Sequence, residues 1–171
     1  DIATINSPTT AQSLGINMVF QHFSLFESLT VAENLILGMS EKISLSKLKS
    51  KSESICDKYG FNLNLNSPIS SLSVGQRQSV EIVRSLLNNP EILIMDEPTS
   101  VLTPEEINKL FKIIKKLVTD GLTVIFISHK LDEIINLSDH VTIMRNGKIV
   151  SNLTTKNEDP ESLGYKMLGY K

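Results

Sequence analysis

The sequence lacks most of the features that mark secreted, membrane-spanning or nucleic-acid-binding proteins. Its single cysteine, Cys56, has no partner for a disulfide within the chain, which is typical of a reduced cytosolic protein. No apolar run is long enough to cross a bilayer, and there is no signal-peptide pattern. The net charge of −2 gives no basic surface for nucleic acid.

The residues that are present favour a soluble, folded domain. Hydrophobic residues make up 40% of the chain and charged residues 21%, which is enough apolar material to bury a core. A length of 171 residues corresponds to one domain or slightly more. The chain opens with Asp-Ile-Ala rather than with Met, so we expect it to be a piece of a longer protein.

The stretch 93–99, Leu-Ile-Met-Asp-Glu-Pro-Thr, is the most informative part of the sequence. Its apolar run is typical of a strand buried on both faces of a parallel sheet, and Pro98 ends that strand. Asp96 and Glu97 then lie at the carboxyl edge of the sheet and point in different directions. One carboxylate can hold a hard cation such as Mg²⁺ while its neighbour handles a proton on water. An isolated acid pair could equally be two solvated side chains at the end of a strand.

A helix predicted over 103–118 separates this strand from a second buried, β-branched strand predicted at 122–128. Such a βαβ unit has parallel strands, whose carboxyl ends lie on the same edge of the sheet. We therefore expect Ser128 and His129 to lie beside the two carboxylates. A lone histidine after a strand is usually structural, but one on the same edge as two acids is a better candidate for chemistry.

The segment that begins at Leu72 predicts a helix whose first turn could bind an anion. Ser73 suits the N-cap position, and apolar residues at helical spacing continue as far as 88–90, Asn-Asn-Pro. A helix start directs N–H groups and a positive dipole end toward a nearby anion. Gly75 allows a ligand to approach the backbone closely. Taken alone, this motif describes an ordinary capped helix.

The remaining elements frame these segments. The lysines of the segment 41–58 are interpreted as the solvated face of an amphipathic helix. The pattern predicts helices over 7–15, 31–37, 41–58, 130–137 and 160–168, a strand over 16–20 that Gln21 follows, a loop over 59–68, and a hairpin of 141–144 with 148–153 about Asn146-Gly147.

Four pieces of the chain, in a fixed order, resemble the ATP-binding cassette (ABC) ATPases, the motor subunits of ABC transporters. The resemblance covers nearly the whole chain. Gln21 is similar to the Q-loop of that family, Leu72-Ser73-Val74-Gly75-Gln76 to the signature motif, 92–97 to the Walker B strand, 100–103 to the D-loop, and His129, after Ser128, to the H-loop.

The resemblance implies a fold and its divisions. The fold would be α/β and P-loop NTPase-like, with a mostly parallel sheet that forms the carboxyl half of the core and an inserted α-helical subdomain. Residues 1–171 would form a single partial cassette, with the helical subdomain at 22–89 and parts of the ATPase core at 1–21 and 90–171.

The resemblance also implies ATP hydrolysis with Mg²⁺ and a role for each residue at the strand ends. Asp96 would hold Mg²⁺, and Gln21 would sense both Mg²⁺ and the attacking water. Glu97 would polarise that water, and His129 would contact the γ-phosphate of ATP. Phosphoryl transfer depends mainly on positioning and charge neutralisation, which such residues provide.

The signature residues imply a partner. Ser73, Gly75 and Gln76 would close over the γ-phosphate of an ATP molecule held by a second cassette, either in a homodimer or in a tandem chain. The resemblance further implies transmembrane permease subunits, an indirect link to a periplasmic or lipoprotein solute-binding protein, and no nucleic acid. The location would be peripheral, on the cytoplasmic face of the inner membrane.

Finer features resemble a subgroup of the family. The sequences at 21–23, 29–34 and 98–106 are similar to those of bacterial importers of simple sugars or nucleosides. In that subgroup, as here, a threonine (Thr103) often replaces the usual aspartate of the D-loop. The solute class implied is therefore a sugar or a nucleoside.

The largest departure from the family pattern is a missing motif. No Gly-x-x-x-x-Gly-Lys-Ser/Thr occurs, and Gly147-Lys148 does not qualify because Ile149 follows it within a hairpin. In the family this phosphate loop precedes the Q-loop, so it would lie upstream of Asp1. We therefore expect a truncated cassette that on its own binds ATP weakly and hydrolyses little or none.

Two other functions are weighed against a transporter ATPase. A soluble ABC-type ATPase of DNA repair or translation would often carry long coiled coils or basic arms, and neither occurs here. A non-catalytic cassette that only donates its signature motif would need neither Glu97 nor His129, and both are present.

Overall fold

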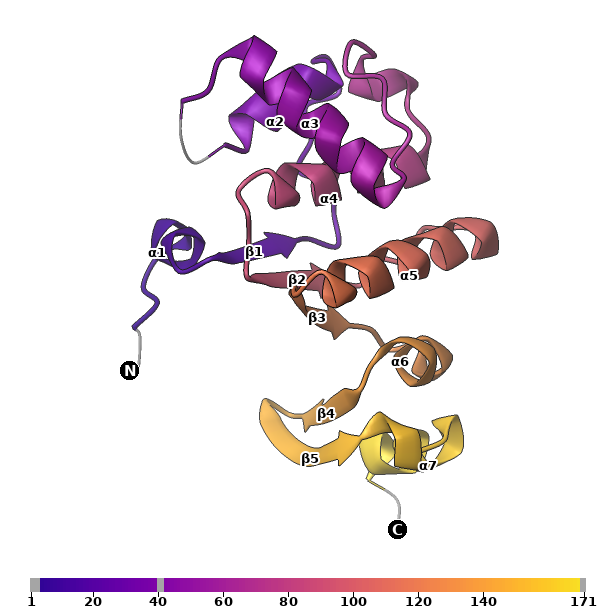
Figure 1. The fold of residues 1–171 in the computed structure, drawn as a ribbon. Coiled ribbons are helices and arrows are strands. Elements are labelled where there is room, and N and C mark those ends of the chain that lie inside the picture. Colours follow the sequence, from indigo (N-terminus) through magenta and orange to yellow (C-terminus); the bar gives the residue numbers. More distant parts are fainter. Residues whose placement is uncertain (1–3, 40–41, 170–171) are drawn as a thin grey trace. The chain divides into compact units, whose positions relative to one another are not determined.

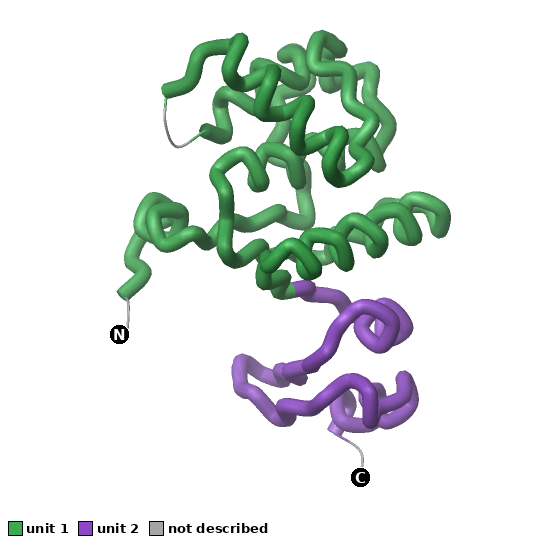
Figure 2. Tube along the Cα trace, viewed as in Figure 1, with its two compact units in different colours: residues 1–125 green, residues 126–171 purple. Residues whose placement is uncertain are grey.

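The chain forms two compact units, one that ends at Ile125 and one that begins at Phe126 (Figure 2). The structure is a computed structural model that describes residues 4–39 and 42–169 (Figure 1). Across these two ranges, no helix has the length and apolar character needed to cross a membrane. The division into a helical subdomain at 22–89 and core segments on either side stays a prediction.

The first unit is built on a short sheet. Its strands, in spatial order, are β1 (Ile16–Val19), β2 (Ile92–Asp96) and β3 (Thr123–Ile127), and β3 crosses the boundary between the units. The prediction that β3 is buried is wrong: it lies at the end of the described strand order, and Ile125 and Ile127 are 47% and 43% exposed. β1 and β2 are parallel, in line with the predicted mostly parallel sheet, with Val19 opposite Met95. Both of these side chains are fully buried, as is Leu93. The parallel register places the residues that follow β1 and β2 at the same edge of the sheet.

Helices α2 (Val31–Leu37), α3 (Leu45–Tyr59) and α4 (Val74–Leu86) gather on one side of this sheet (Figure 1). Helix α4 contacts β1 as well as α2 and α3, so it connects the helical cluster to the sheet. Its apolar stripe is buried at Val80 and Val83, as the helical spacing predicts. The short helix α1 (Pro8–Ser13) contacts β1, and the long helix α5 (Pro104–Thr119) contacts α3.

Most element bounds agree with the sequence pattern, and the differences lie at the connections. Helix α3 begins at Leu45, because the Ser44 hydroxyl accepts the Lys47 N–H at 3.3 Å and caps it; position 41 lies outside the described residues. The helix includes Tyr59, which was predicted to be in the loop, and ends at Gly60 with φ of 80°. The single-turn helices η1 (Ile69–Ser71) and η2 (Thr155–Asn157) were not predicted, because one turn leaves no periodic pattern.

The prediction of a solvated lysine face on α3 holds for Lys47 and is wrong for Lys51. The Lys51 side chain is only partly exposed, and its Nζ donates to the Leu87 carbonyl at 3.0 Å. A lysine can bury its aliphatic stem while its ammonium reaches a helix C-terminus, where a cation is favoured. Lys51 therefore helps to join α3 to the end of α4.

The second unit consists of α6 (Leu131–Leu137), β4 (His140–Arg145), β5 (Lys148–Thr154) and α7 (Pro160–Leu168). The strands form an antiparallel hairpin. Its turn has φ of 51° at Asn146 and 73° at Gly147, the positive values that the predicted type I′ turn requires. The core of this unit is formed by Ile134, Ile143 and Leu163.

Cys56 lies on the buried face of α3 and is expected to react slowly. Burial raises the pKa of its thiol to about 11, with smaller contributions from Asp57 and Glu53. Only the thiolate is nucleophilic, so alkylation at pH 8 should be about 100-fold slower in the folded chain than in the urea-unfolded chain. The neutral thiol is favoured by folding, so this contribution to stability is lost as the pH rises through about 11. Equal alkylation rates in both states would contradict this prediction.

Candidate functional site

The two adjacent carboxylates lie at a strained turn. Asp96 is the last residue of β2, and the backbone of Glu97 has a φ of 48°, in the left-handed region. A residue other than glycine pays about 1–3 kcal/mol for this conformation, which persists only where the surroundings enforce it. Here Pro98 and Thr99 are buried, and the Ser100 N–H donates to the Glu97 carbonyl at 3.2 Å. Strain of this kind is concentrated at functional sites.

Asp96 and Glu97 are partly exposed residues, although the Glu97 Oε2 atom is buried, and such an acid pair suits a magnesium ion that also binds phosphate. Within residues 4–39 and 42–169, no group of three or more acidic, histidine or cysteine side chains is arranged to hold a metal. Mg²⁺ commonly needs only one or two protein carboxylates, because water and substrate phosphates supply its remaining ligands. The donor set after β2 therefore fits Mg²⁺ delivered with a nucleotide.

The first turn of α4 is closed by a capping box. The Ser73 hydroxyl accepts the Gln76 N–H at 3.2 Å, and the Gln76 side-chain oxygen accepts the Ser73 N–H at 3.0 Å. Two of the three predicted phosphate-binding residues thus hold the helix start in shape. The amides of Val74 and Gly75 lie in the same first turn, where N–H groups have no intrahelical acceptor. This arrangement favours an anion at the helix start.

Gly75 lies against the start of α5. A Cβ atom at this position would be 2.2 Å from the Glu106 Oε1 atom. The other oxygen of that carboxylate accepts the Thr103 N–H at 3.0 Å in the capping box of α5. Residues 73, 75 and 76 line a cavity of about 630 Å³ together with Leu102 and Glu106. The predicted signature motif and the predicted D-loop therefore share one cavity.

Gly75→Ala should destabilise the chain by about 1–2 kcal/mol, because Glu106 must leave its capping box to make room. Alanine is otherwise the better helix former, so the penalty comes from this contact. In a Glu106→Ala background the same substitution should cost less than about 0.5 kcal/mol or stabilise the chain. Urea unfolding of the four proteins measures both values, and equal penalties in the two backgrounds would contradict the argument.

The other predicted site residues lie at loop positions. Gln21 is exposed in the loop that follows β1, and His129 is exposed after β3, in the second unit. The Ser128 hydroxyl accepts the Lys130 N–H at 3.1 Å and donates to Glu133 Oε2 at 3.2 Å, so it organises the start of α6. The prediction that Ser128 and His129 lie beside the two carboxylates stays a prediction.

Sequence reasoning missed a buried ion pair on α4. Glu81 and Arg84 form an ion pair, and both contact the backbone of Ser24, three residues after Gln21. Burial raises the pKa of Glu81, while Arg84 and the Ser24 N–H act in the opposite direction. The spacing of three residues between opposite charges, within the apolar pattern of α4, was the signal that could have revealed it.

Comparison with known proteins identifies the relatives of this chain. A family model described as "ABC transporter" matches residues 2–100. The nucleoside import ATP-binding protein NupA of Lactococcus lactis is 40% identical over 98% of this chain and 34% of its own length. The guanosine import ATP-binding protein NupO of Bacillus subtilis is 42% identical over 96% of this chain and 33% of its own length. The chain thus spans about a third of the length of these curated relatives.

Solved structures agree with the fold. A nucleotide-free ATP-binding cassette from an ABC transporter superimposes with a TM-score of 0.77 at 28% identity, over 92% of this chain and 70% of that one. A dimeric ATP-binding cassette in a post-hydrolysis state, bound to ADP and phosphate, gives 0.73 at 26% identity, over 88% of this chain and 68% of that one. The predicted P-loop NTPase-like α/β fold is confirmed.

Proposed function

Because this chain belongs to the ABC transporter family of ATP-binding proteins, we propose that it is part of a subunit that hydrolyses ATP to power the import of a small solute. The relatives described above are named for the import of nucleosides and guanosine, and the ribose import protein RbsA of Streptococcus agalactiae is 38% identical over 98% of this chain and 35% of its own length. The proposed solute is therefore a sugar or a nucleoside.

The observation that carries this proposal is the strained backbone of Glu97 directly after Asp96. A cassette that only donates its signature motif gains nothing from keeping a glutamate in a left-handed conformation at this point. In this proposal the Glu97 carboxylate accepts a proton from the attacking water, and Asp96 holds Mg²⁺. Bound Mg²⁺ would neutralise charge on the phosphates. In this proposal Gln21 senses Mg²⁺ and water, and His129 contacts the γ-phosphate.

The start of α4 serves a different nucleotide in this proposal. Ser73, Gly75 and Gln76 close over the γ-phosphate of ATP held by a second cassette, in a homodimer or a tandem chain. The capping box supports this role, because it fixes the first turn before any anion arrives and so lowers the cost of binding. The sequence of this chain contains no phosphate loop of its own, so the chain alone should hydrolyse little or no ATP.

A role in solute import requires partner proteins in the membrane and outside it. The subunit would bind transmembrane permease subunits on the cytoplasmic face of the inner membrane, and a solute-binding protein would act with it indirectly. A tagged full-length protein, purified from membranes, should bring down a multi-spanning subunit and support ATP-dependent uptake of labelled nucleoside or ribose by vesicles. Recovery with DNA-repair or ribosomal partners, without a membrane subunit or uptake, would favour a soluble ABC-type ATPase instead.

A further inference from the structure

We propose that the buried Glu81–Arg84 pair is a positioning device that makes the loop after Gln21 and the helix that carries the signature motif move as one body. The inference rests on the proposed function, since it assigns a use to this coupling in ATP-driven transport. It adds two residues of α4 to those that the sequence singles out, and neither of them touches a nucleotide in this proposal.

The Glu81–Arg84 pair forms hydrogen bonds with both backbone groups of Ser24. Glu81 Oε1 accepts the Ser24 N–H at 2.7 Å, and an Arg84 Nη atom donates to the Ser24 carbonyl at 2.8 Å. The remaining carboxylate oxygen of Glu81 pairs with the other Arg84 Nη atom. Each side chain therefore holds one half of the same peptide segment while it neutralises the charge of the other. Removing the Arg84 side chain would leave the buried Glu81 charge without its partner.

Arg84 also packs against the end of α2. A Cβ atom at Gly38, the C-cap of α2, would lie 2.3 Å from the Arg84 Cγ atom, so only glycine leaves room for the arginine stem. The Asn88 side chain donates to the Gly38 carbonyl at 3.0 Å. The pair thus joins three segments: the loop at Ser24, the end of α2, and α4 itself.

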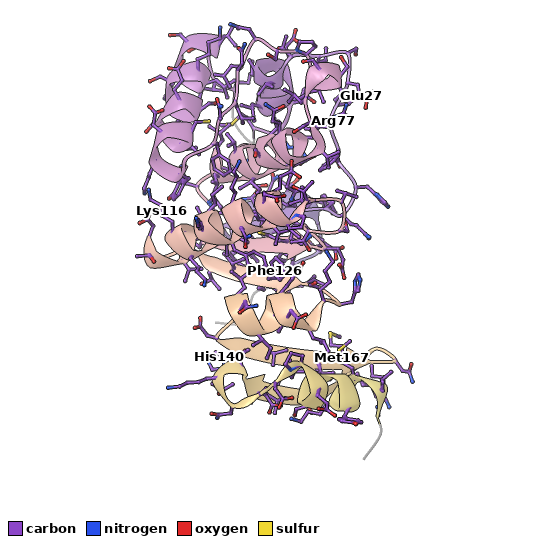
Figure 3. The ribbon with its side chains drawn as sticks, turned by 90° about the vertical axis from the view of Figure 1, so that its right-hand side faces the viewer. Glu27, Arg77, Lys116, Phe126, His140 and Met167 are labelled. Carbon is purple, nitrogen blue, oxygen red and sulfur yellow. The ribbon has the colours of Figure 1, made fainter. Side chains whose placement is uncertain are left out.

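A second ion pair between the same loop and the same helix provides a contrast. Arg77 pairs with Glu27 at 2.6 Å, and the two lie side by side in Figure 3. The two arginine side chains are similarly exposed, 23% for Arg77 and 18% for Arg84, but the Glu27 side chain is 65% exposed and that of Glu81 only 2%. Exposed pairs contribute little because water and salt screen them, whereas breaking a buried pair is costly. The restraint on the loop therefore comes mainly from the buried pair.

In transport, the pair would couple movement of the loop after Gln21 to movement of α4. Gln21 is three residues before Ser24, and the signature residues Ser73 and Gly75 lie at the start of the helix that grips Ser24. A shift of the loop on nucleotide binding or permease contact must then carry α4 with it, or break the buried pair. Without the pair, the loop could move while α4 stayed in place, and ATP would be hydrolysed without transport.

The exchange rate of the Ser24 amide hydrogen in this chain measures directly how firmly Glu81 holds it. Glu81→Gln should speed exchange of the Ser24 amide about tenfold or more, because the pair that holds it loses its charge. The Phe26 amide is held by Asn34 instead, so its exchange should change less than about twofold. Glu27→Gln, the matched change in the exposed pair, should leave the exchange of both amides within about twofold. An unchanged exchange rate at Ser24, or an equal acceleration at Phe26, would overturn the proposal that the Glu81–Arg84 pair restrains the loop at Ser24.

Transport by the full-length protein, assembled with its permease, tests the coupling. Glu81→Gln should reduce solute uptake per ATP hydrolysed at least about fivefold, with the KM for ATP changed less than about twofold, and Glu27→Gln should alter neither. Uptake per ATP that stays normal although Ser24 exchange has accelerated overturns the coupling role. Failure of the unsubstituted protein to couple ATP to uptake would instead count against the proposed function, and the exchange result for Ser24 would stand.

Discussion

Glu97→Gln in the full-length protein should leave ATP binding nearly intact and lower its hydrolysis about 10²–10⁴-fold. The amide has the same size as the carboxylate, so the left-handed turn after β2 should be kept, together with its buried neighbours Pro98 and Thr99. What is lost is the group that accepts a proton from the attacking water, and a positioned general base contributes about this factor. The comparison is of kcat and nucleotide affinity between the two proteins.

Glu105→Gln provides the matched control for this prediction. Glu105 is an exposed acid in the first turn of α5, where a negative charge interacts favourably with the helix dipole. Its substitution should change kcat less than about twofold, because surface changes away from the reacting atoms rarely matter. A Glu97→Gln protein that hydrolyses ATP at the normal rate would show that the strained glutamate is structural only.

Asn34→Asp should destabilise the chain by about 3 kcal/mol. The Asn34 side chain is 1% exposed, accepts the Phe26 N–H at 2.7 Å, and donates to the carbonyls of Phe26 at 3.1 Å and Thr30 at 2.9 Å. A carboxylate would keep the first bond but turn a negative charge toward two carbonyl oxygens in a buried site. The loop that carries Phe26 should then loosen, and urea unfolding gives the loss of stability.

The stability loss caused by Asn34→Asp should depend on pH in a definite direction. Burial would raise the pKa of the introduced carboxyl in the folded state, so the loss should be largest near pH 7 and shrink as the pH falls toward about 4. Asn108→Asp makes the same chemical change at an exposed position of α5 and should shift stability less than about 0.5 kcal/mol. A loss that is independent of pH, or equal in both variants, would contradict the role assigned to Asn34.

The α-helices and strands of the fold could be predicted from sequence because each carries a local signal, which the single-turn helices η1 and η2 lack. Thr30, Ser73 and Thr103 each cap a helix together with the residue three positions later, and all three capping boxes are present in the structure. The run at 92–96 forms a strand that buries Leu93 and Met95 and ends at Asp96, the first of the two acids. These signals depend on neighbours within a few positions, which a sequence displays directly.

Contacts between distant segments could not be predicted in the same way. Glu106 is recognisable as a capping residue, but its approach to Gly75 depends on how α4 and α5 pack. Ser24 carries no sequence signal at all, because Glu81 and Arg84 hold its backbone and not its side chain. The left-handed conformation of Glu97 is likewise invisible in the sequence, since glycine or asparagine would be the expected residue there.

Hydrolysis of Mg-ATP by the purified 171-residue chain and by the full-length protein tests the central claim most directly. The account predicts turnover by the full-length protein, its loss on Glu97→Gln, and no turnover above background by the chain, whose own sequence has no loop to hold the β- and γ-phosphates. Appreciable turnover by the chain alone, or a full-length protein that hydrolyses no ATP, would contradict it.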